Sequence, residues 1–97
     1  MAKRVDRNHA EIVRALRQVP GMTVFSLHTL GGGIPDLCCG YRGVTALVEV
    51  KTEKGKLNAL QQQWHAAWEG RPVAVIRNTD DVARLILEIT HQSGRDS

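Results

Sequence analysis

Two charged residues interrupt an apolar stretch of the chain. The run Val44-Thr45-Ala46-Leu47-Val48 is followed directly by Glu49-Val50-Lys51. The apolar run predicts a strand over residues 44–51 in the interior of a sheet, since its side chains are apolar on both faces. Side chains alternate along a strand, so Glu49 and Lys51 share one face. Burying such charges is costly unless they are paired or bind a metal, which makes this strand a candidate site.

A third charged residue is expected on the same face. We expect residues 35–39 and 44–51 to form a hairpin closed by the loop Gly40-Tyr41-Arg42-Gly43. Cys39 then opposes Val44, and Asp36 opposes Leu47, whose face Glu49 shares. Asp36 and Glu49 become diagonal neighbours with backbones roughly 7–8 Å apart. A slip of the register by one residue would move Asp36 to the other face.

Two clustered carboxylates suit Mg²⁺ or Mn²⁺, which take oxygen ligands and leave room for a phosphate oxygen. Such a metal polarises the phosphate and lowers the pKa of a bound water. Lys51 would orient or deprotonate that water, or stabilise charge in the transition state. This chemistry is phosphodiester hydrolysis. A solvated Glu-x-Lys ion pair and a Pro35-Asp36 turn remain the alternative interpretation of the same residues.

The rest of the chain supplies elements that would position these residues. The order α-β-β-β-α-β-α predicts an α/β fold in which one mixed sheet carries helices. Residues 1–97 form one domain, with 1–6 and 93–97 expected to be frayed. Asn8 is the expected N-cap of the first helix, Asn58 that of the second, and Gly70 the residue just after the second. The remaining expected segments are helices 8–18, 58–69 and one from Thr79, and strands 22–28 and 72–77.

The motif residues resemble a known nuclease signature. Pro35-Asp36, followed by Glu49-Val50-Lys51, is similar to the PD-(D/E)xK pattern. The wider sequence resembles the VRR-NUC (virus-type replication-repair nuclease) family of that superfamily, and the resemblance covers most of the chain from Glu11 to the last strand. It implies a restriction-endonuclease-like fold. The stretches that carry it are Gly33–Leu37, Leu47–Thr52, Gly55–Leu57 and Gln61–Trp64.

The resemblance also implies a role for each matched residue. Asp36, Glu49 and the backbone carbonyl of Val50 would ligate Mg²⁺ or Mn²⁺, and Lys51 would be the catalytic lysine. Gln61 would assist near the metal or the phosphate, and Glu11 would contact a metal-bound water. One departure is the pair Asn58-Ala59, where many members have Ser-Pro or Thr-Pro; this changes the start of the helix and leaves the site residues intact.

Family members of this size imply a function in DNA repair. The expected activity is that of a metal-dependent DNA endonuclease acting on branched DNA, as a homodimeric Holliday-junction resolvase. A two-fold dimer would present two sites to the two strands of a junction. The alternatives are a flap or end-trimming nuclease, a non-catalytic DNA-binding module of the same fold, and a structural domain that only oligomerises.

Charge and composition are compatible with a nucleic-acid partner. The chain has 13 Lys and Arg against 10 Asp and Glu, and the pI is about 9.2. Mild basicity favours a polyanion without proving one. Lys54, Lys56 and Arg42 are candidate phosphate contacts, although charges on turns are often only solvated. Cys38 and Cys39 are adjacent, which excludes a disulfide framework.

No membrane span or secretory signal is expected, because no apolar run is long enough and the N-terminus is charged. This favours the cytoplasm, and the resemblance to the VRR-NUC family implies that of a bacterium or of a phage-infected host. Gln61, Trp64, His65 and Trp68 share one face of the second helix, where packing is favoured over base stacking for the tryptophans. His28 is expected to close the end of its strand, with DNA contact as the alternative.

Overall fold

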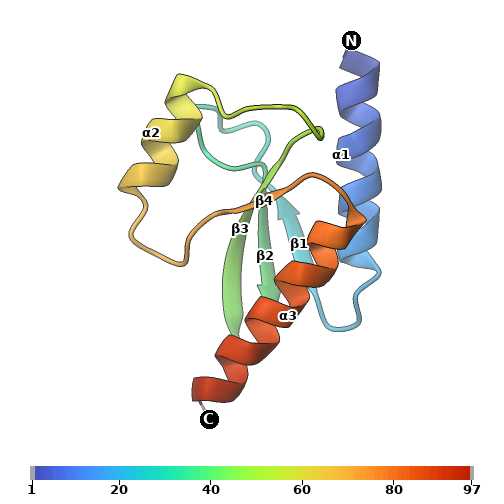
Figure 1. Cartoon of the computed structure of the whole chain (residues 1–97), viewed down its shortest axis with the longest axis vertical. Coiled ribbons are helices and arrows are strands. Elements are labelled where there is room, and N and C mark those ends of the chain that lie inside the picture. Colours follow the sequence, from blue (N-terminus) through green and yellow to red (C-terminus); the bar gives the residue numbers. More distant parts are fainter. Residues whose placement is uncertain (1, 97) are drawn as a thin grey trace.

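The computed structural model describes residues 2–96 and the side chains of residues 8–92. Three helices and a four-stranded mixed sheet form an α/β fold, as expected for the class (Figure 1). Fraying at residues 1–6 and 93–97 stays a prediction, and residues 1 and 97 lie outside the described part. In chain order the elements are α1 (Ala2–Arg17), β1 (Thr23–Ser26), β2 (Leu37–Tyr41), β3 (Val44–Val50), α2 (Ala59–Ala67), β4 (Ala74–Ile76) and α3 (Thr79–Asp96).

The strands lie in the order β1-β2-β3-β4. Antiparallel pairing joins β1, β2 and β3, and β4 pairs in parallel with β3 after the crossover through α2. Strand β3 is therefore interior, as its apolar sequence predicts. Strands β1 and β4 are shorter than the expected ranges 22–28 and 72–77.

The β2–β3 hairpin closes more tightly than predicted. Arg42 and Gly43 both have positive φ, 52° and 81°, which is the geometry of a two-residue turn. Tyr41 therefore pairs with Val44, and Cys39 pairs with Ala46, so the predicted register is wrong by two residues. A shift of two conserves the face of every side chain. One further step of the observed register sets Asp36 against Glu49.

Helices α1 and α3 cover one face of the sheet and make the core with it. Apolar residues recur at helical spacing on both helices and meet alternate residues of β2 and β3. Ile12, Leu16, Leu37, Val48 and Ile89 are each at most 1% exposed. The remaining members of this buried cluster are Cys39, Ala46, Ile76, Val82 and Leu85.

Helix α1 begins six residues before its expected start. It runs from Ala2, so Asn8 is not an N-cap, and that prediction is wrong. No glycine or proline interrupts residues 2–17, so the helix continues through its N-terminal segment. The Asn8 side chain instead donates from Nδ2 to the Lys51 carbonyl oxygen, 2.8 Å away. This bond fastens α1 to the end of β3.

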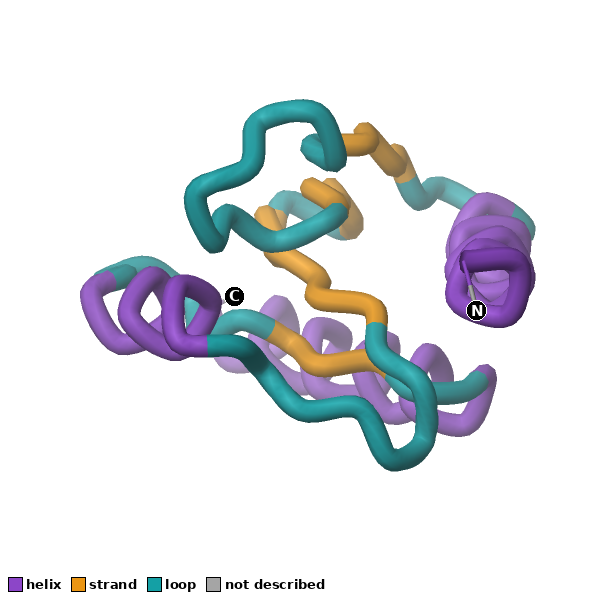
Figure 2. Tube along the Cα trace, turned by 90° about the horizontal axis from the view of Figure 1, so that it is seen from above, coloured by secondary structure: helices purple, strands orange, loops and turns teal. Residues whose placement is uncertain are grey.

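Helix α2 lies on the opposite side of the sheet from α1 (Figure 2). It begins as predicted after Asn58, whose Oδ1 accepts from the Gln61 backbone while Gln61 Oε1 accepts from the Asn58 backbone. It ends at Ala67 because Trp68 is extended, with ψ of 123°, so Gly70 is not its C′ residue and that prediction is wrong. No side chain of α2 is fully buried; polar contacts must therefore help to hold it.

Candidate active site

Glu49 is a buried carboxylate near the end of β3. It is 1% exposed, and it points to the face of the sheet that carries α2. Its Oε2 accepts from Gln61 Nε2 at 3.2 Å, and its Oε1 lies 3.3 Å from His65 Nε2. Gln61 and His65 are four residues apart on α2, so both side chains reach the same carboxylate. The buried acid and the second helix thus hold each other in place.

Asp36 stands beside Glu49 where the β2–β3 ladder ends. The last pair of this ladder is Leu37 with Val48, and Asp36 Oδ2 accepts from the Val50 N–H at 2.9 Å. The Asp36 carbonyl accepts from the Leu27 N–H at 2.7 Å, which ties β1 to the same point. The N–H and C=O of a strand residue point the same way, so the Val50 carbonyl is directed to the side of Asp36.

The surroundings of Glu49 raise its affinity for a proton. Burial is the first cause; the hydrogen bond to Asp36 and its charge add to it, and Lys51 acts in the opposite direction. Together they raise the pKa of Glu49 to about 8. Burial, and then the charge of Lys51, lower the pKa of His65. The pair of acids therefore concentrates negative charge that a proton or a cation can offset.

Lys51 follows directly after β3, and its backbone is fixed from two sides. Its N–H donates to the Ile76 carbonyl at 3.0 Å, and its C=O accepts from Asn8. The turn that follows is held by Arg77, whose Nη1 donates to the carbonyls of Thr52 (2.7 Å) and Gly55 (2.6 Å). The basic turn at residues 54–56 is therefore an ordered part of the wall next to Lys51.

One cavity of about 550 Å³ gathers most of the predicted site. Among the predicted residues, it is lined by Asp36, Glu49, Val50, Lys51 and Gln61. The other lining residues are Asn8, His9, Ser26, His28, Thr52 and Gly55.

The remaining predicted residues stand outside this lining. Glu11 is exposed on α1 and does not line the cavity. Lys54 and Lys56 are exposed on either side of Gly55, which does line it. Arg42 sits in the hairpin turn, six residues from Asp36 and so roughly 20 Å along the strand. The structure thus places the two lysines at the rim of the cavity and Arg42 at the opposite end of the sheet.

Sequence reasoning passed over several residues that meet at this site. His65 was assigned to a packing face, and Asn8 to a helix cap. The spacing of Gln61 and His65 on one helix was the signal that could have paired them. Arg77 and His9 gave no local signal, because their contacts join segments far apart in the sequence.

The residues present fit a small hard cation. Asp36, Glu49 and the Val50 carbonyl supply oxygen atoms only, which is the donor type Mg²⁺ and Mn²⁺ prefer. Burial raises the pKa of Glu49 first and the neighbouring Asp36 adds to it; a cation would offset the negative charge of this acid pair. Among the residues whose side chains are described, no three His, Cys, Asp or Glu gather as a ligand set. A cation held here would therefore keep open positions for water and phosphate.

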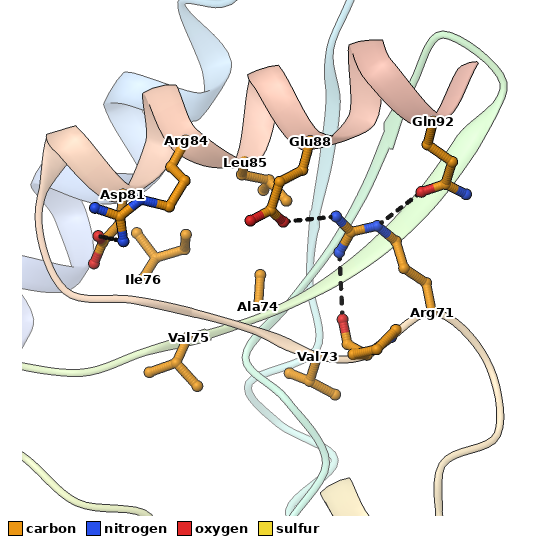
Figure 3. A pocket seen from close by; sticks show the side chains of 11 residues that line it. Arg71, Val73, Ala74, Val75, Ile76, Asp81, Arg84, Leu85, Glu88 and Gln92 are labelled. Atoms are coloured by element: carbon orange, nitrogen blue, oxygen red, sulfur yellow. Dashed lines mark hydrogen bonds and ion pairs between the residues drawn. The ribbon is translucent and has the colours of Figure 1, made fainter. Parts of the chain in front are cut away.

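A second cavity, of about 390 Å³, lies between β4 and α3 (Figure 3). Its charged groups pair with each other. Arg71 donates to Glu88 Oε1 at 3.0 Å and to Gln92 Oε1 at 3.3 Å, and Arg84 lies 3.3 Å from Asp81. The contacts of Arg71 join the segment before β4 to α3, whereas Arg84 and Asp81 both lie on α3. The arrangement supports the fold, and its groups are already partnered.

Comparison with protein-family models, with curated proteins and with solved structures found no significant match to this chain. Within the part of the chain that the structure describes, no helix has the length and apolar character required to span a bilayer.

Proposed function

We propose that the chain is a metal-dependent DNA endonuclease that hydrolyses phosphodiester bonds in branched DNA, with a restriction-endonuclease-like fold. The observation that carries this proposal is the buried Glu49 carboxylate beside Asp36, with Lys51 in the lining of the same cavity. Buried acids are retained at a cost to stability. A binding module would gain nothing from this cost, whereas a metal-assisted hydrolase requires the acids.

Each group has a role that follows from its position. Asp36, Glu49 and the Val50 carbonyl would hold Mg²⁺ or Mn²⁺, which when bound polarises the phosphate and lowers the pKa of water. The Lys51 side chain would orient the attacking water or stabilise negative charge on the phosphate, because Lys51 lines the same cavity. Glu11 is exposed outside the lining, and we leave it out of the proposed machinery.

Gln61 and His65 act on Glu49 and not on the substrate. Each places a nitrogen against one carboxylate oxygen, which fixes the orientation of the ligand. Such supporting hydrogen bonds orient metal ligands and tune their affinity. The proposed machinery therefore includes α2, although this helix contributes no residue to the core.

We further propose that the protein acts as a homodimeric Holliday-junction resolvase in the cytoplasm of a bacterium or of a phage-infected host. Support comes from the resemblance to the VRR-NUC family and from symmetry, since two sites related by a two-fold axis match the two strands to be cut. Sedimentation velocity tests the dimer. A monomer at the concentrations at which junctions are cut would overturn it.

The test of the activity is cleavage of labelled four-way junction, flap, duplex and single-stranded DNA. Each substrate is incubated with Mg²⁺, Mn²⁺ or EDTA, for the wild type, for Lys51→Ala and for Arg84→Ala. Arg84 is a cationic control residue on α3, outside the lining of the cavity that holds Asp36 and Glu49. Paired symmetric nicks in the junction, absent with EDTA and with Lys51→Ala but present with Arg84→Ala, are expected.

The other outcomes assign the protein differently. Metal-dependent cutting of flaps or ends, with the junction left intact, would keep the site and change the substrate to that of a trimming nuclease. Binding of the junction with no cutting in either metal would overturn the catalytic proposal and make the chain a DNA-binding module.

A further inference from the structure

The cavity that holds the carboxylates extends beyond them to a pair of histidines. His9 on α1 and His28 after β1 both line it, with ring centroids 6.2 Å apart and planes tilted by 57°. The same lining also holds the two carboxylates and Lys51. The cavity therefore presents acceptors for a cation and, in its imidazoles, hydrogen-bond donors.

Each histidine is next in sequence to a residue that is tied to the acidic part. Asn8, which precedes His9, donates to the Lys51 carbonyl at 2.8 Å. Leu27, which precedes His28, donates its N–H to the Asp36 carbonyl at 2.7 Å. Both histidines therefore adjoin residues that are hydrogen-bonded to the backbone of the proposed reaction centre.

The imidazoles have donors to offer. His28 is exposed and His9 is half-buried. Among the residues whose side chains are described, neither ring has a hydrogen-bond partner, and their contact with each other is through the rings. An imidazole carries at least one N–H at neutral pH. Two N–H groups in a cavity whose lining also includes Lys51 form a place for an anion.

We propose that His9 and His28 bind a backbone phosphodiester group near the one that is cut. This inference rests on the proposed nuclease function and adds a substrate subsite to it. A transition metal is the less suitable occupant, because two imidazoles fall short of the three or four ligands that zinc takes. A diester phosphate offers the two acceptor oxygens that the pair can share.

The test is a binding measurement that does not depend on cleavage. Affinity for a labelled four-way junction is measured in EDTA for the wild type, for His9→Ala/His28→Ala and for the control His91→Ala, an exposed histidine on α3. The double variant should bind about tenfold more weakly, since two ordinary hydrogen bonds are lost, while His91→Ala should bind like the wild type. Folding of each variant is checked by its thermal midpoint.

Junctions in which one phosphate at a time is replaced by a neutral methylphosphonate locate the contact. In the wild type, one replacement beside the cutting position should weaken binding by about the same factor. In the double variant that replacement should have no further effect, because the partner is already absent. His9→Gln/His28→Gln, which restores N–H donors, should recover part of the affinity and guards against a folding defect in the alanine variant.

The outcomes separate this inference from the proposed function. A double variant that binds like the wild type, or that remains as sensitive as the wild type to every methylphosphonate, overturns the subsite. A wild type that shows the predicted interference but cuts no DNA in Mg²⁺ or Mn²⁺ overturns the nuclease and leaves the phosphate contact standing. If the double variant cuts junctions at the normal rate at saturating DNA but with a raised KM, the result supports both the subsite and the nuclease function.

Discussion

The side chain of Gln61 joins the cap of α2 to the buried carboxylate of Glu49. Its Oε1 accepts from the Asn58 N–H at 2.9 Å, and its Nε2 donates to Glu49 Oε2 at 3.2 Å. One amide therefore starts the helix and orients the acid. Because α2 buries no side chain fully, the position of the helix and that of Glu49 depend on each other.

Substitutions at Gln61 separate these two roles. Gln61→Glu retains an acceptor for the cap but places a second carboxylate against Glu49. It should conserve α2 while lowering the cleavage rate about tenfold, because the acid pair loses its donor and gains repulsion. Gln61→Ala should lower the rate and also cost about 1 kcal/mol of stability through the lost cap. Rates on junction DNA and urea unfolding check both, and an undiminished rate for Gln61→Glu would remove the amide from the machinery.

A close approach at Gly33 allows the glycine loop to reach α2. Gly33 has φ of 84°, and a Cβ there would collide with the backbone oxygen of Leu60, next to Gln61. Gly32 has φ of 65° and open space around its Cβ position. Both alanine variants carry the cost of positive φ, about 1 kcal/mol, but only Gly33→Ala must also displace α2. Gly33→Ala should therefore reduce cleavage severalfold and lower the thermal midpoint below that of Gly32→Ala; equal effects would contradict the close approach.

Stability without metal should fall as the pH rises. The folded state raises the pKa of Glu49 from 4.5 to about 8, so between these values the folded chain holds a proton that the unfolded chain has lost. The unfolding free energy then decreases with pH through this window and is flat below it. Glu49→Gln should lose this slope. Urea unfolding in EDTA across the pH range checks it, and an unchanged slope in Glu49→Gln would assign the effect to another group.

Bound metal should restore part of the stability that the protein loses as the pH rises. Mg²⁺ or Mn²⁺ requires the ionised carboxylate and so competes with the proton. Added Mg²⁺ should therefore raise the thermal midpoint more at pH 8 than at pH 6. Asp36→Asn should abolish the difference, whereas Asp80→Asn, at an exposed acid in the first turn of α3, should leave it intact.

The rim lysines should contribute to the salt dependence of binding. Replacing Lys54 and Lys56 by alanine removes two candidate phosphate contacts. The slope of log affinity against log salt should become shallower by roughly 2, since each contact contributes about 0.9. The control is Arg42→Asn, at the far end of the hairpin, which should leave the slope unchanged. Asparagine is chosen because it tolerates positive φ. A slope unaltered by the double lysine change would place these residues outside the interface.

The sequence by itself determined which face carries the chemistry. The side chains of β3 alternate between two faces, and any register that pairs Asp36 with an odd-numbered residue of β3 puts it on the same face as Glu49. For this reason an error of two residues in the hairpin left the predicted cluster intact. The α/β class could also be predicted, because apolar residues recur with one spacing in helices and with another in strands.

Only the tertiary structure decided the distances and the partners. The register depended on the positive φ of Arg42, a backbone conformation that arginine does not favour. Asn8, predicted to cap a helix, instead bonds to Lys51, which lies 43 residues away in the sequence. His65 of α2 contacts Glu49 of β3. Local sequence encodes the period and the caps of an element. Contacts between distant segments depend on how the elements pack, and these contacts hold the acid pair, Lys51 and the two histidines around one cavity.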